Sequence, residues 1–175
     1  QAFHKELVPR SGGLAGIISL TIFFIIYFLL FKKLLVDYLI LSIAIFSLGF
    51  MEDIKFRINP KYRLILMIGI LIFFIITFSI DIRSIDLRFL NTWMTSDIFS
   101  IAFILLCFLF IINGANLVDG FNGLLIIHLI IINFILLVLN LNNNNQDLAI
   151  PISAQIVVLL SLLLFNFPKS KIFLG

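Results

Sequence analysis

Charged residues are scarce in this chain. Lys, Arg, Asp and Glu together make up 12% of its 175 residues, and hydrophobic residues make up 62%, whereas soluble domains contain about 25% charged and roughly 45–50% apolar residues. This composition excludes an ordinary soluble domain and predicts an integral membrane protein. The single cysteine, Cys107, excludes an internal disulfide, and its place in an apolar run favours a packing role over a redox role.

The net charge of +3 is small, so the basic residues are interpreted as markers of membrane topology and not as a nucleic-acid-binding surface. Apolar segments recur along the whole chain, which excludes one amino-terminal signal peptide as their explanation. The predicted fold class is all-α: a polytopic membrane helical bundle with about six transmembrane helices, forming a single integral membrane domain over residues 1–175. The predicted spans are 14–31, 38–51, 64–80, 98–112, 124–139 and 148–167.

The first predicted span would be about 27 Å long, close to the roughly 30 Å hydrocarbon thickness, and the second is a little short. Asp37 is predicted to cap the second span, and Asn59-Pro60 marks a turn or a fresh helix start. Six spans place the segments 1–13, 52–63, 113–123 and 168–175 on one side. These segments contain eight Lys and Arg residues against four on the other side, so the positive-inside rule makes them cytoplasmic.

A polar stretch at 113–124 separates two long apolar runs. It has an acid or an amide at every third position, namely Asn113, Asn116, Asp119 and Asn122, which predicts one polar face on a tight or helical turn. Three glycines in the same stretch permit unusual backbone angles and close approach of a ligand. Ionisable groups at membrane depth are usually functional, so the stretch is interpreted as a site. The alternative is that the amides only satisfy backbone groups at a re-entrant turn.

Two further polar segments fall on the same predicted side. Glu52 and Asp53 end the second span; they offer hard oxygen ligands for Mg²⁺ or a proton acceptor, although a charged helix end is the alternative. Lys5 and Arg10 precede Gly12-Gly13, and this combination is suited to hold a phosphate through side-chain charge and backbone N–H groups. His128, alone in the fifth span, is interpreted as a packing residue.

Taken in order, these segments resemble the polyprenyl-phosphate N-acetylhexosamine-1-phosphate transferases of glycosyltransferase family 4. His4-x4-Pro9-Arg10-x-Gly12-Gly13 is similar to the family's first cytoplasmic turn. Gly-Phe-Met-Glu-Asp at 49–53, followed by Pro60-Lys61-x-Arg63, is similar to its Asp-Asp loop, and 113–124 is similar to its most specific signature. The amino-terminal turn favours the undecaprenyl-phosphate N-acetylglucosaminyl-1-phosphate transferase branch, which serves O-antigen and teichoic acid synthesis, over the peptidoglycan branch.

The resemblance implies an enzyme of the bacterial inner membrane with cytoplasmic active-site loops. The phosphate of undecaprenyl phosphate would attack the sugar-proximal phosphate of a UDP-N-acetylhexosamine, and UMP would leave. Mg²⁺, or Mn²⁺ in its place, is the implied cofactor; the partners are undecaprenyl phosphate, the UDP-sugar and membrane lipid, with no nucleic acid and with a homodimer left open. The implied catalytic residues are Asp53, Glu52 and Asp119, the metal ligands are Asp119 and Asp53, and the substrate-binding residues are Asn116, Asn113, Asn122, Lys5, Arg10 and Lys61.

The chain departs from the family pattern at three places. Glu52 stands where the family usually has Asp, and Asn122 stands where many members have a second Asp. Phe-Leu-Gly at 173–175 is similar to the start of the family's Phe-x-Gly-Asp loop, and the sequence stops one residue short of the Asp that binds Mg²⁺ in the family. The expectation is therefore a fragment, inactive alone, that lacks the family's first span and its carboxy-terminal spans.

Two other classes of protein compete with this interpretation. A secondary transporter would use the polar break at 113–123 to bind its substrate near the middle of the membrane. A purely structural membrane subunit would have no need of three polar segments on one side. The depth of Asp119 distinguishes the transferase from the transporter, because the transferase requires it at the cytoplasmic edge.

Overall fold

The described part of the chain is built from helices. The computed structural model describes residues 11–33, 35–53, 59–82, 84–85, 87–119, 122–168 and 171–172, with the backbone alone described for Glu52 and Asp53. These residues contain helices and no strands, which confirms the predicted all-α class. The helices are α1 (Gly12–Phe31), α2 (Val36–Asp53), α3 (Pro60–Thr77), α4 (Arg88–Met94), α5 (Asp97–Val118), α6 (Leu124–Asn142) and α7 (Gln146–Asn166).

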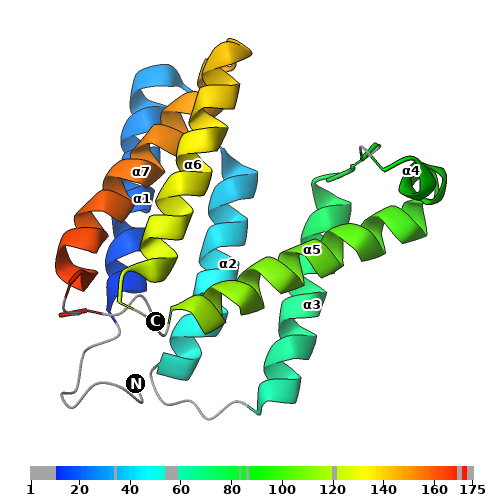
Figure 1. The fold of residues 1–175 in the computed structure, drawn as a ribbon, viewed down its shortest axis with the longest axis horizontal. Coiled ribbons are helices and arrows are strands. Elements are labelled where there is room, and N and C mark those ends of the chain that lie inside the picture. The colour runs from blue at the N-terminus through cyan, green and yellow to red at the C-terminus, as the bar shows by residue number, and fades with distance from the viewer. Residues whose placement is uncertain are drawn as a thin grey trace. The chain divides into compact units, whose positions relative to one another are not determined.

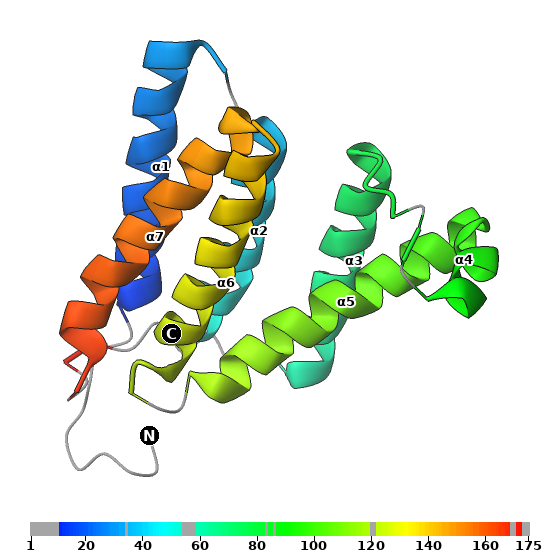
Figure 2. The ribbon, with the colours of Figure 1, turned by 45° about the horizontal axis from the view of Figure 1, so that its top comes forward.

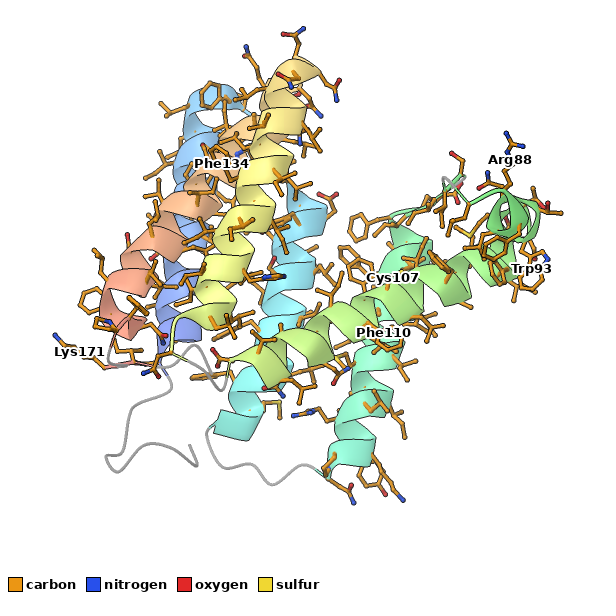
Figure 3. All side chains as sticks on the ribbon, viewed as in Figure 1. Arg88, Trp93, Cys107, Phe110, Phe134 and Lys171 are labelled. Atoms are coloured by element: carbon orange, nitrogen blue, oxygen red, sulfur yellow. The ribbon has the colours of Figure 1, made fainter. Side chains whose placement is uncertain are left out.

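Five of these helices, α1, α3, α5, α6 and α7, are long and apolar enough to cross a membrane. The apolar part of α2, Val36–Met51, is shorter, as the sequence predicts. Large apolar side chains lie on the outside of the long helices: Leu30 is 71% exposed, Phe110 76% and Leu164 79%, and Figure 3 labels Phe110 on α5. Such surfaces are unfavourable in water and suit a lipid environment, so the chain is a multi-pass membrane protein.

The chain divides into two compact units. The first comprises the described residues of Gln1–Ser42 and Leu117–Gly175, and in it α7 packs against both α1 and α6 (Figure 1). Its buried side chains include Phe24 and Tyr27 of α1 and Ile126 of α6. The ring of Phe24 lies 5.3 Å from that of Tyr38 in α2, whose hydroxyl accepts a hydrogen bond from the Gln155 amide of α7.

The first unit has helix ends of the candidate site at one end and an exposed ion pair at the other. The beginnings of α1 and α6 and the end of α7 lie together at the lower end in Figure 1. At the opposite end Lys33 Nζ lies 2.6 Å from Asp147 Oδ1, between side chains that are 57% and 60% exposed. The hydrogen bond from Lys33 to Asp147 raises the pKa of the lysine. This ion pair joins the loop that follows α1 to the first turn of α7, which agrees with the predicted alternation that puts both on the same side of the membrane.

We expect this alternation to appear in labelling from one side of the membrane. Single cysteines placed at Lys33 or Asp147, with Cys107 replaced by serine, should react with an impermeant maleimide on intact cells. A cysteine at Lys171, which lies beyond the end of α7 (Figure 3), should react only after permeabilisation. Labelling of Lys33 and Asp147 from different sides would contradict the arrangement of α1 and α7.

The second unit covers Ile43–Asn116. Asn59 caps α3 by accepting a 3.1 Å hydrogen bond from the Lys61 backbone N–H, and Pro60 occupies the first helical turn, which confirms the predicted helix start. The buried side chains of α3 are Met67, Leu71, Phe74 and Ile75. The short helix α4, which follows α3 and precedes α5 along the chain (Figure 2), carries Trp93, which is 58% exposed and suits a position at a membrane interface.

Several helix boundaries shift by a few residues from the prediction, and three differences matter most. α5 continues to Val118, six residues beyond the predicted end at 112, because asparagine and glycine lower helix propensity without stopping a helix that is already formed. α4 was not expected from the sequence. Asp37 lies in the first turn of α2 and not before it, where its charge still complements the helix dipole.

Candidate functional site

The centre of the candidate site is the turn between α5 and α6. α5 ends at Val118, Asp119 follows in a turn, and Asn122 and Gly123 form the turn that precedes α6. Gly123 is the N-cap of α6 with φ 71° and ψ −9°, a left-handed conformation that favours glycine. Its carbonyl accepts a 2.9 Å bond from the Ile127 N–H, which starts the helix. The left-handed backbone at the start of α6 therefore explains why the motif has glycine at position 123.

Gly123 is buried against α7. A Cβ at this position would lie 3.2 Å from Leu163 Cδ1 and 3.2 Å from Phe167 Cβ. The backbone N–H of Gly123 donates to Oδ1 of Asn166, the last residue of α7. Because Asn166 is only 4% exposed, this contact lies inside the unit, and it fixes the end of the turn to the end of α7.

A second set of contacts holds the segment that follows α7. Nδ2 of Asn166 donates to the Ile172 carbonyl at 2.6 Å, and Nδ2 of Asn122 donates to the Pro168 carbonyl at 3.2 Å. The Lys171 N–H donates to the Phe165 carbonyl at 2.9 Å. The turn and the residues after α7 are thus joined by two asparagine side chains, Asn122 in the turn before α6 and Asn166 at the end of α7.

The amides upstream of the turn lie on α5. Asn113 is half-buried, and its Nδ2 donates to the Leu109 carbonyl of its own helix at 2.7 Å. Asn116 is exposed and, being three residues further on, shares that face of the helix. Only these two members of the every-third-residue pattern are helical, because α5 ends at Val118. Asp119 and Asn122 belong to the turn.

Asp119 is partly buried and has an interaction partner. Lys61 is exposed in the first turn of α3, where a cation is accessible to an anionic ligand. Lys5 and Arg10 lie outside the described residues, as do the side chains of Glu52 and Asp53, whose backbone forms the last turn of α2. The roles assigned to these four residues stay predictions.

The described side chains contain no group of three or more His, Cys, Asp or Glu placed to hold a metal ion. Mg²⁺ does not require such a cage, since it is commonly bound through one or two carboxylates together with substrate phosphates and water. A single carboxylate between the end of α5 and the start of α6 fits that chemistry. Asp119 is therefore a suitable ligand, and the Mg²⁺ site stays a prediction.

Asn166 is the residue that the sequence did not reveal. It ends a long apolar helix, two residues before Pro168, and an isolated amide there resembles an ordinary helix terminus. The available signal is its chemical type, because a buried asparagine must find partners for both its oxygen and its nitrogen.

Comparison with known proteins identifies related sequences. Residues 35–175 match the family model of glycosyl transferase family 4. The chain is 32% identical over 99% of its length to phospho-N-acetylmuramoyl-pentapeptide-transferase of Dictyoglomus turgidum, covering 55% of that relative. It is 27% identical over 98% of its length to the enzyme of the same name from Bacillus subtilis, covering 56% of that protein.

A third relative has a different name. The chain is 25% identical over 98% of its length to the probable undecaprenyl-phosphate N-acetylglucosaminyl 1-phosphate transferase of Bacillus subtilis, covering 48% of it. The chain thus spans about half the length of the curated relatives it matches. No solved structure matches it significantly. Because the relatives' names come from both branches of the resemblance, the branch stays a prediction.

Proposed function

The chain belongs to glycosyl transferase family 4, and from that membership we propose that it is part of an enzyme that transfers a sugar-1-phosphate to undecaprenyl phosphate. The donor is a UDP-N-acetylhexosamine, and the reaction takes place at the cytoplasmic face of the bacterial inner membrane. An oxygen of the lipid phosphate attacks the sugar-proximal phosphorus, the bond between the two donor phosphates breaks, and UMP leaves. The product is a lipid-pyrophosphate-linked sugar.

The observation that carries this proposal is the position of Asp119 at the end of a full-length span. α5 contains 22 residues, about 33 Å at the helical rise, which matches the roughly 30 Å thickness of the hydrocarbon layer. Asp119 follows directly, and the turn it begins packs against the end of α7. A carboxylate that follows a helix of this length would lie at the membrane surface, which suits a reaction between a soluble nucleotide and a lipid phosphate, whereas the transporter alternative needs the polar break near the membrane centre.

All of the predicted site residues except Asn122 have a chemical task in this reaction. Asp119 and Asp53 are the carboxylates that would hold Mg²⁺, which when bound neutralises charge on the donor pyrophosphate. Asp53, with Glu52 beside it, would orient and activate the lipid phosphate. Asn116 and Asn113 would hydrogen-bond the nucleotide or its phosphates, and Lys61, with Lys5 and Arg10, would attract the anionic substrates.

The test is UMP release by the full-length protein in lipid nanodiscs. UMP should appear only when a UDP-N-acetylhexosamine and undecaprenyl phosphate are both present, and the rate should depend on the concentration of each. Undecaprenol, which lacks the phosphate, serves as the matched control acceptor. UMP release that continues without a lipid phosphate would contradict the proposal, because it would indicate hydrolysis of the donor.

Removal of divalent cations is a separate prediction. We expect EDTA to lower UMP release at least a hundredfold, since charge stabilisation by a metal ion contributes several kcal/mol to such a transfer. Mg²⁺ should restore the rate fully and Mn²⁺ at least partly, as measured by titrating each ion into metal-free enzyme. Full activity in EDTA would rule out the metal-dependent form of the mechanism.

A further inference from the structure

Two asparagines join the turn residues Asn122 and Gly123 to Pro168 and Ile172, which follow α7. Asn166 accepts from the Gly123 N–H and donates to the Ile172 carbonyl, and Asn122 donates to the Pro168 carbonyl. Each side chain therefore makes a hydrogen bond to a backbone group more than 40 residues away in sequence, Asn122 to Pro168 and Asn166 to Gly123. Both polar atoms of the buried Asn166 amide are used in this way.

Both positions need a side chain that can donate to a backbone carbonyl, and position 166 must also accept from the Gly123 N–H. The asparagine amide meets these requirements. A carbonyl oxygen requires a donor, and an ionised carboxylate has none. Aspartate at 166 would keep an acceptor for Gly123 but would place its second oxygen against the Ile172 carbonyl. Aspartate at 122 would face the Pro168 carbonyl in the same unfavourable way. The asparagine at 122, which departs from the acid common in the family, thus has a structural reason in this chain.

We propose that Asn122 and Asn166 form an amide clamp, a pair of positioning residues that fixes Asn122 and Gly123, at the start of α6, against Pro168 and Ile172 after α7. The catalytic consequence of the clamp rests on the proposed function, because the clamp would keep Asp119 in its position in the candidate site. Small displacements of a positioned group are costly in catalysis. The clamp itself, however, is a contact of this fold and is testable without activity.

The clamp and the loss of a metal or substrate ligand are two different explanations for the asparagine at position 122. If Asn122 were a ligand position that had lost its charge, Asn122→Asp would keep or raise activity. The clamp predicts the opposite order: the natural Asn is the most active, Asn122→Gln, which keeps an NH2 donor on a longer arm, is intermediate, and Asn122→Asp is the least active. We expect about a tenfold loss of kcat/KM for Asn122→Asp, the effect of one lost hydrogen bond together with an unfavourable contact.

The matched control is Asn140→Asp. Asn140 lies in α6, and its Nδ2 donates to the Leu136 carbonyl of its own helix at 2.8 Å, so the same type of bond is lost without touching the clamp. We expect Asn140→Asp to stay within twofold of the natural protein. Asn166→Asp and Asn166→Ala should lower kcat/KM on the order of a hundredfold per folded protein, because a buried donor or acceptor is left unpaired.

Amide hydrogen exchange separates the clamp from its catalytic consequence. In full-length protein labelled with ¹⁵N-glycine, the Gly123 N–H should exchange at least tenfold faster in Asn166→Ala. It should remain slow in Asn166→Asp, which keeps the acceptor, and in Asn140→Asp. Unchanged Gly123 exchange in Asn166→Ala would overturn the clamp even if the natural protein is a transferase. A natural protein without transferase activity but with faster exchange in Asn166→Ala would support the clamp and refute the proposed function instead.

The activity outcomes are equally decisive. Asn122→Asp with activity equal to or above that of the natural protein would overturn the clamp in favour of a ligand role. Asn166→Asp with normal kcat/KM per folded protein would show that the Ile172 contact is only structural. Loss of activity in both variants, with Asn140→Asp unaffected, is the result that the clamp predicts.

Discussion

Replacing Asp119 by asparagine should lower kcat of the full-length enzyme about a thousandfold, with little change in the amount of folded protein. Asparagine keeps the size and the oxygen of the side chain but removes its charge. A neutral amide is a poor ligand for Mg²⁺ and no longer balances the charge that the ion brings, so several kcal/mol of transition-state stabilisation are lost. The rate of UMP release at saturating substrates measures the effect.

Asp147→Asn is the matched control for this prediction. Asp147 carries the same carboxylate at the opposite end of the first unit, where it pairs with the exposed Lys33. Exposed ion pairs contribute little to stability, so this variant should fold normally and keep its turnover within about twofold. Normal turnover in Asp119→Asn, or equal losses in both variants, would contradict the assignment of Asp119 to the reaction.

Replacing Gly123 by alanine should give the largest loss of stability among the substitutions considered. The left-handed conformation of Gly123 costs an alanine about 1–2 kcal/mol. Its Cβ would also meet Leu163 and Phe167 at 3.2 Å, and overpacking of this kind costs about 1–3 kcal/mol. We therefore expect roughly 2–5 kcal/mol of destabilisation in total, seen as a lower thermal unfolding midpoint in detergent.

Gly69→Ala is the control for Gly123→Ala. Gly69 lies inside α3, and a Cβ there would meet nothing within 4 Å. Since alanine is a better helix former than glycine by about 1 kcal/mol, the unfolding midpoint should stay the same or rise slightly. A midpoint for Gly123→Ala that matches that of Gly69→Ala would show that the turn is free to rearrange and that its packing against α7 is not essential.

The spans could be predicted from the sequence because each long apolar run needs a lipid environment and an internally bonded backbone. The ends were harder to predict where polarity and helicity disagree. The sequence predicts that the span ends at 112 and that Asn113 and Asn116 lie in a tight or helical turn, yet both continue α5 itself, since their amides are compatible with a helix that began at Asp97. The left-handed turn at Gly123 follows from its glycine, and the start of α3 follows from Asn59-Pro60.

The sequence could predict the parts of the candidate site that depend on the type of side chain. Asp119, with the amides and glycines around it, stands out from two apolar runs. Asn166 was missed because its partners are the Gly123 N–H and the Ile172 carbonyl, and backbone groups leave no residue-type signal in a sequence. Only the packing of α6 on α7 brings the first of these partners to the asparagine.

The most direct test follows the phosphorus atom of the donor. With UDP-N-acetylglucosamine carrying ³²P in the sugar-proximal phosphate, the full-length protein and undecaprenyl phosphate should yield label in the lipid product and one unlabelled UMP for each labelled lipid formed. This result would establish transfer of a sugar-1-phosphate. Label that stays in released UDP would mean that only the sugar is transferred, and label released as free sugar phosphate would mean hydrolysis; either outcome would contradict the proposed reaction.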